Sequence, residues 1–144
     1  MNETYDQVFS MNSDGSGVTK LTDTRASCLY PAWSPGREYI AFERNSTIYV
    51  METTGEANGG RTFTVGPSSG DGLDWSPDGQ SLVFVGPGVV NTHGIWIVAV
   101  DPDTEDVGTP MLTIDDGGYY TPCFSPDGSR IAYSAGIEMR VFDL

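Results

Sequence analysis

The 144-residue sequence has little cysteine and little positive charge, and each scarcity argues against a class of protein. Its two cysteines, Cys28 and Cys123, do not form a disulfide framework, so we expect two free thiols. Seven basic residues against 20 acidic ones leave a net charge of −13. Such a surface repels phosphate backbones and anionic membranes, so neither nucleic acid nor a membrane is an expected partner. The charge suits a cationic partner or a metal, although solubility alone is the commoner explanation.

Long apolar runs and helical periodicity are missing as well. No stretch approaches the roughly 18 apolar residues that are needed to cross a membrane. Residues 1–9 contain neither a basic region nor an apolar core, so we expect no secretory signal in them. Instead, 18 glycines and 9 prolines separate short apolar segments, many of them in turn dipeptides. This composition predicts an all-β domain built from many short strands.

What the sequence does contain is one hairpin in three copies. The copies are WSPGREYIAF at Trp33–Phe42, WSPDGQSLVF at Trp75–Phe84 and FSPDGSRIAY at Phe124–Tyr133. In the second copy, proline presets the first corner of the turn, Asp78 can hydrogen-bond forward to the backbone, and Gly79 takes the positive φ. The apolar residues that follow suit a strand buried on both faces.

The first copy has Gly36 and Arg37 where the others have Asp-Gly. We expect that turn to keep its shape less well, or to bend by a different route. The interval from Trp33 to Trp75 is 42 residues and that from Trp75 to Phe124 is 49, the excess coming from the loop 86–94 and the turn 101–108. Periods of about 40–50 residues with four strands each are the signature of propeller blades.

The whole chain, 1–144, is predicted to be a single segment of such repeats. Two strands are expected within 7–22, and units follow at 31–65, 72–113 and 121–144. The first two units contain four strands and the last contains three. Leu21, Phe63 and Leu112 each precede the first strand of the next unit by ten residues, which suggests one common register.

These repeats resemble those of TolB-type β-propellers, which also occur in the propellers attached to prolyl-oligopeptidase-like peptidases. The resemblance is carried by PAWSP…IAF…STIYVMETTG, LDWSPDG…LVF…GIWIVAVD and PCFSPDG…IAY…MRVFDL, and the N-terminal QVFSMNSDGSGVTKLT is similar to the second half of such a repeat. The resemblance implies blades of a six-bladed ring. It also implies a periplasmic location if the natural chain has further N-terminal residues; the cytoplasm is the default otherwise.

The strand count gives a β-propeller of about three four-stranded blades per chain, and the resemblance implies that these are half of a six-bladed ring. An open arc of three blades would leave two apolar faces in water, which soluble proteins avoid. We therefore expect a homodimeric ring, in which the blade at 121–144 is completed by an N-terminal strand of the other subunit. One N-terminal strand then has no assigned place. The alternative is that this chain is a fragment of a longer protein whose other blades close the ring.

Two motifs suggest chemistry, and for both we favour a structural interpretation. GPSSG at 66–70 matches G-x-S-x-G, but a nucleophile elbow needs a following helix, and this motif lies between two predicted strands. DPDTED at 101–106 has oxygen ligands at spacings seen in calcium loops, but Asp106 stands where an EF-hand needs glycine. We expect a blade-connecting loop and a solvated acidic hairpin, with no catalytic residue, metal or cofactor.

Five residues are the candidates for binding. Three tyrosines precede the first strand of a blade and should lie near the channel mouth; the other two candidates are a carboxylate that could face the channel and the histidine of the insert 86–94. They are Tyr30, Tyr119, Tyr120, Asp71 and His93. The recurring aromatics Trp33, Trp75 and Phe124 are expected to pack between blades.

The favoured function is therefore a non-enzymatic scaffold that binds a protein or peptide. One alternative is a propeller that serves an enzyme, as in the peptidases with similar repeats. Another is a metal-binding channel protein, for which Asp71 and Asp115 are the candidate ligands. Fold similarity alone does not choose among them.

Overall fold

The computed structural model describes residues 4–70, 72–89, 93–115 and 121–144. In this part of the chain, the secondary structure consists of strands and one short 3-10 helix, Glu56–Asn58 (η1). The predicted all-β class is therefore confirmed. No helix among the described residues is long and apolar enough to span a membrane.

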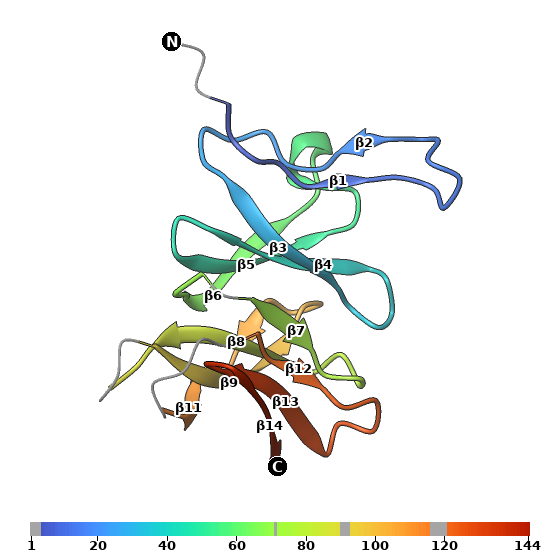
Figure 1. The fold of residues 1–144 in the computed structure, drawn as a ribbon. Helices are drawn as coiled ribbons and strands as arrows, with labels where there is room; N and C mark the ends of the chain where they lie inside the picture. The colour runs from blue at the N-terminus through green and yellow to red at the C-terminus, as the bar shows by residue number, and fades with distance from the viewer. Residues whose placement is uncertain (1–3, 71, 90–92, 116–120) are drawn as a thin grey trace.

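Four antiparallel layers follow one another in chain order (Figure 1). The first layer is a two-stranded hairpin of β1 (Phe9–Ser10) and β2 (Thr19–Lys20). The second is a four-stranded sheet. Its strands, in spatial order, are β3 (Cys28–Trp33), β4 (Tyr39–Arg44), β5 (Thr47–Glu52) and β6 (Thr62–Pro67).

The third and fourth layers repeat this plan. In the third layer β9 pairs with β8 along one edge and with β10 and β11 along the other. Its strands are β7 (Leu73–Trp75), β8 (Ser81–Pro87), β9 (His93–Asp101), β10 (Asp106–Val107) and β11 (Met111–Ile114). The fourth layer has three strands, which are β12 (Cys123–Phe124), β13 (Arg130–Ala135) and β14 (Glu138–Asp143). The first strands β3, β7 and β12 lie next to one another through the stack.

Apolar residues on both faces of the second strands explain why the sheets stack. Ile40 and Phe42 of β4 face the N-terminal hairpin, whereas Ala41 faces the third layer. In β8, Leu82 faces the second layer, whereas Val83 faces the fourth layer. A strand that is apolar on both faces is stable only between two neighbours.

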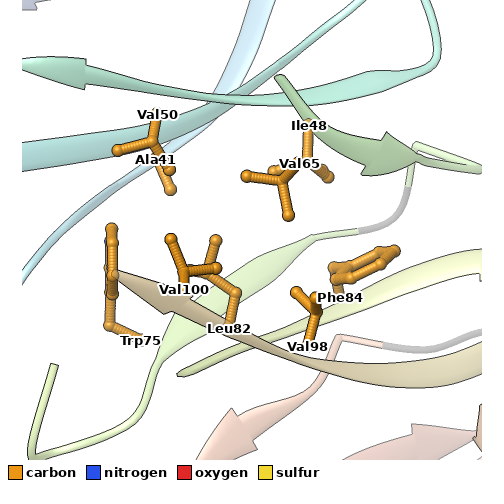
Figure 2. Packing of buried hydrophobic residues seen from close by; sticks show 9 residues of the cluster. All are labelled: Ala41, Ile48, Val50, Val65, Trp75, Leu82, Phe84, Val98 and Val100. Atoms are coloured by element: carbon orange, nitrogen blue, oxygen red, sulfur yellow. The ribbon is translucent and has the colours of Figure 1, made fainter. Parts of the chain in front are cut away.

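Three hydrophobic clusters fill the three interfaces between layers. Figure 2 shows the central cluster, in which side chains from β4, β5 and β6 meet side chains from β7, β8 and β9. Its buried members are Ala41, Ile48, Val50, Val65, Trp75, Leu82, Phe84, Val98 and Val100. Because the layers touch only their neighbours, each cluster belongs to one junction, as in repeat proteins.

The turn at Gly36 and Arg37 does not differ from the other two, contrary to expectation. Arg37 takes φ +63°, close to the φ of +73° at Gly79, and its N–H donates to the Ser34 carbonyl at 2.9 Å. The Gly79 N–H donates to the Ser76 carbonyl at the same distance. The surrounding hairpin imposes the turn, so arginine occupies a conformation that favours glycine.

Two further details depart from the sequence prediction. The predicted turn 101–108 contains a short strand, β10, that extends the β9 hairpin. The outer-strand residues buried toward the next layer are Leu21, Val65 and Ile114, whereas Phe63 and Leu112 are only half-buried. The common ten-residue register is therefore wrong at Leu21, because the interval from Leu21 to Trp33 is two residues longer than those from Val65 to Trp75 and from Ile114 to Phe124.

Candidate functional site

Tyr30 lies at an irregularity of the first strand of the second layer. The pairing of β3 with β4 shifts between Leu29 and Ala32, and Tyr30 within this bulge has φ +52°. At the equivalent place of the next repeat, Gly72 has φ +117°. The tyrosine side chain is 44% exposed. The bulge therefore holds a non-glycine residue in a strained backbone and directs an aromatic side chain into solvent.

His93 begins β9 and lies opposite Pro87, at the point where the hairpin 87–93 closes. It is half-buried and belongs to the third layer, whereas Tyr30 belongs to the second. No contact joins these two among the contacts observed in the described residues. The other three predicted binding residues, Asp71, Tyr119 and Tyr120, lie outside the described residues.

The G-x-S-x-G segment connects two strands, as predicted, because β6 ends at Pro67 and β7 begins at Leu73. Ser68 at its centre is buried, and its Oγ donates to Glu43 Oε2 at 2.8 Å. The same oxygen accepts the Gly70 N–H at 3.1 Å. The hydroxyl thus fastens the loop to the end of β4 and satisfies a buried carboxylate, a pair that the sequence analysis did not single out.

The acidic segment 101–106 forms an exposed hairpin, as predicted, and ties two layers together. Tyr39 of β4 donates its hydroxyl hydrogen to Asp103 Oδ1 at 2.6 Å, and Arg61 Nη1 lies 3.1 Å from Glu105 Oε1. The hydrogen bond to Asp103, with burial as a second cause, raises the pKa of Tyr39 to about 12. Across the described ranges, no three His, Cys, Asp or Glu side chains are grouped closely enough to hold a metal ion.

The aromatic residues at the repeat position do not share one environment. Trp75 is 4% exposed, and its Nε1–H donates to the Ala32 carbonyl of the preceding layer at 3.2 Å. Phe124 packs against the cluster between the third and fourth layers. Trp33 is 52% exposed, so the expectation that it packs between blades is wrong in the single chain. In the described part of the chain, the first layer contains only β1 and β2 and provides no inner strand beside β3 on which Trp33 could pack.

The last layer also exposes apolar side chains. Cys123, Met139 and Val141 are exposed on β12 and β14, and all six residues of β14 are exposed. At the other end of the stack, Phe9 and Met11 are exposed on the N-terminal hairpin. The sequence predicted uncovered faces but did not indicate which residues lie on them. Aligning β1 and β14 with β5 in the repeat identifies these residues.

No family model matches this chain. The uncharacterized peptidase YuxL of Bacillus subtilis is 27% identical over 135 residues, which cover 91% of this chain and 18% of the peptidase. TolB from Acinetobacter baumannii superimposes with a TM-score of 0.73 and 21% identity, over 96% of this chain and 35% of TolB. An oligogalacturonate lyase in complex with manganese has a TM-score of 0.68 and 14% identity, over 98% of this chain and 42% of the lyase.

The chain thus spans less than half of each of these proteins. The structural likeness confirms the predicted fold, a TolB-like β-propeller arrangement of antiparallel sheets. In this fold each layer is a blade, and the first strands β3, β7 and β12 are the innermost strands.

Proposed function

We propose that this chain is a non-enzymatic propeller segment that binds a protein or peptide and assembles as a homodimeric ring. The observation that carries the assembly is the contrast between Trp33, 52% exposed, and Trp75, 4% exposed, at one repeat position. Blade faces that are buried between neighbouring blades inside the chain are exposed to water at the two ends of the stack. Exposed apolar patches of this kind mark interaction surfaces.

Binding is assigned to the loops around Tyr30. Tyrosine supplies rigid contact area at a low entropic cost, and the strained φ of +52° keeps this side chain directed outward. The net charge of −13 favours a cationic partner, because the surface field attracts positive charge. A basic peptide or a basic protein loop is therefore the ligand class that this site fits.

The second candidate is a propeller segment that accompanies an enzyme. The 27% identity to an uncharacterized peptidase over 135 residues favours it, since that protein is more than five times as long as the matched part. In this case the chain would position or gate a substrate for a catalytic domain outside 1–144. A metal site of the channel type is tested separately, by measuring the metal content of the purified chain and of Asp115→Asn.

Panning a displayed random-peptide library on the purified chain tests the binding role. We expect enrichment of peptides rich in lysine and arginine, with affinities that fall at least about tenfold in Tyr30→Ala, the loss expected from truncating a tyrosine hot spot. Tyr39→Phe is the control, since Tyr39 begins β4 beside the hairpin turn, whereas the bulge at Tyr30 in β3 lies nearer the opposite end of β4. Enriched peptides that bind wild type and Tyr30→Ala equally well would overturn the assignment to Tyr30.

A further inference from the structure

The N-terminal hairpin occupies the place of the two outer strands of a blade. Val8 and Leu21 pack on Ile40 and Phe42 of the second layer. In the next junction, Ile48 of β5 and Val65 of β6 pack on the equivalent residues Leu82 and Phe84. β1 therefore corresponds to β5, and β2 corresponds to β6. The places of the two inner strands, beside β3 and β4, hold no described strand.

The exposure of Trp33 follows from this arrangement. In the junction between the second and third layers, the indole of Trp75 rests against the first strand β3 and donates to the Ala32 carbonyl. The equivalent partner for Trp33 would be a first strand beside β3. A hollow lined by Trp33, Pro35 and Thr53 lies at this place.

The other end of the chain presents the missing pair of strands. β12 and β13 are the two inner strands of the last blade, and no described layer covers their outward face, which carries Cys123 and Ala132 beside the polar Arg130 and Ser134. By repeat position, Cys123 corresponds to Ala32 and Ala132 corresponds to Ala41, which are covered by the third layer. The two ends of one chain are therefore complementary in strand number and strand position.

We infer that two copies of this chain join head to tail, so that β12 and β13 of one copy and β1 and β2 of the other form a composite blade. In this blade the Trp33 indole donates to the Cys123 carbonyl of the second copy, as Trp75 donates to Ala32. Two whole blades from each copy and two composite blades make six. The inference rests on the homodimer proposed above and specifies its junction.

The composite blade requires β14 to be displaced. β14 and the second copy's β1 correspond to the same strand, because both match β5 in the repeat register. At the two positions that face the preceding blade, the N-terminal hairpin has Phe9 of β1 and Met11 just after β1, whereas β14 has Arg140 and Phe142. Phe9 and Met11 are 55% and 69% exposed in the single chain and become covered in the ring. At these two positions the exchange thus places two apolar side chains where β14 has one charged and one apolar side chain.

A cross-strand disulfide tests this junction. Val50 lies opposite Ala41 in the second layer, so Ser10 should lie opposite Ala132 of the second copy. Directly opposed residues have Cβ atoms about 4.5–5.5 Å apart, near the separation that a disulfide needs. Within one chain these residues lie at opposite ends of the stack, so only two copies can form the bond (Figure 1). We would combine Ser10→Cys and Ala132→Cys with Cys123→Ser, which removes the exposed native thiol.

Mild oxidation should convert this variant into a covalent dimer, with the bond between the two introduced thiols located by peptide mass spectrometry. The control variant carries Ser134→Cys in place of Ala132→Cys. It moves the thiol to a diagonal position about 7–8 Å away, and its cross-linking should be at least about tenfold slower. Equal cross-linking of both variants would overturn the register.

The native mass of the unmodified chain distinguishes a failure of the composite blade from a failure of the homodimer. A non-covalent dimer that fails to cross-link through Ser10→Cys and Ala132→Cys would overturn the composite blade but leave the homodimer intact. A chain that is monomeric and does not cross-link would overturn both, and the strands beside β3 would then have to come from residues outside 1–144 or from another polypeptide.

Discussion

Three serine hydroxyls hold the three hairpin turns in one shape. Ser34, Ser76 and Ser125 each accept, through Oγ, the backbone N–H of the residue five positions on, at 3.1, 2.9 and 3.0 Å. In the second and third turns an aspartate adds further bonds; Asp78 accepts the Ser76 hydroxyl hydrogen at 2.6 Å. The first turn lacks that aspartate but keeps the serine, so its shape survives. The missing Asp-Gly pair therefore matters less to the shape of the turn than the serine that all three copies share.

Restoring the aspartate should therefore stabilise the protein. Gly36 has a negative φ, and a side chain there would meet only the Glu38 carboxylate, 3.9 Å from the Cβ position. Gly36→Asp should raise the free energy of unfolding by about 0.5–1.5 kcal/mol, through the hydrogen bond and a less flexible unfolded chain. Urea titration of Gly36→Asp beside Gly36→Ala separates the two causes. Equal gains in both variants would show that the carboxylate makes no bond.

The bond between Tyr39 and Asp103 makes stability depend on pH in the alkaline range. The pKa of Tyr39 is raised from 10.0 to about 12 in the folded protein, first by this bond and second by burial. Since the folded pKa lies above the unfolded one, the contribution is complete below pH 10 and is lost as pH rises toward 12. Wild type and Tyr39→Phe should therefore converge in stability between pH 10 and 12. A difference in stability between wild type and Tyr39→Phe that stays constant from pH 10 to 12 would contradict the assignment of the raised pKa to this bond.

At the scale of the strand, residues that are apolar on both faces were recognisable from sequence. The segments Ile40–Phe42 and Leu82–Val85 predicted strands between two neighbours, and each lies between two layers. The outer strand at Leu21 was placed out of register, because loop length before a first strand varies and the sequence alone shows only the spacing. The strained φ of Tyr30 was invisible too, since tyrosine has no preference that signals it.

Leu21 should be the main anchor of the N-terminal hairpin. It is fully buried, and its N–H donates to the Val8 carbonyl at 2.8 Å. Leu21→Ala should lower the free energy of unfolding by about 2–5 kcal/mol, the cost of removing a buried leucine. Val18→Ala, on an exposed side chain of the same hairpin, should change it by no more than about 0.5 kcal/mol. If both variants unfold alike, the hairpin does not pack as a layer.

For the molecule as a whole, the sequence predicted a propeller of TolB type, because turn, aromatic and strand positions recur in register. It did not identify a ligand, since similar blades support different functions and the distinguishing residues lie in loops. Trp33 shows a second limit. Its repeat position predicted packing, but its environment depends on which strands lie beside β3, and the residues of its own repeat do not determine this.

Salt should strengthen the proposed dimer. Each copy has a net charge of −13, whereas the residues assigned to the junction are mainly uncharged. Bringing two acidic copies together costs electrostatic energy that salt screens, and apolar contacts do not weaken in salt. Between 50 and 500 mM sodium chloride (on the order of a threefold change in the Debye length), the dissociation constant of the dimer should fall. A rise would indicate that ion pairs hold the copies together.

The most direct test of a two-copy ring is the mass of the native chain by sedimentation equilibrium. We expect a single species of twice the 15.5 kDa chain mass across a tenfold range of protein concentration around about 10 μM. With about three blades in each copy, only an assembly of two copies contains six blades. A mass of 15.5 kDa throughout that range, with the protein folded and soluble, would contradict the account.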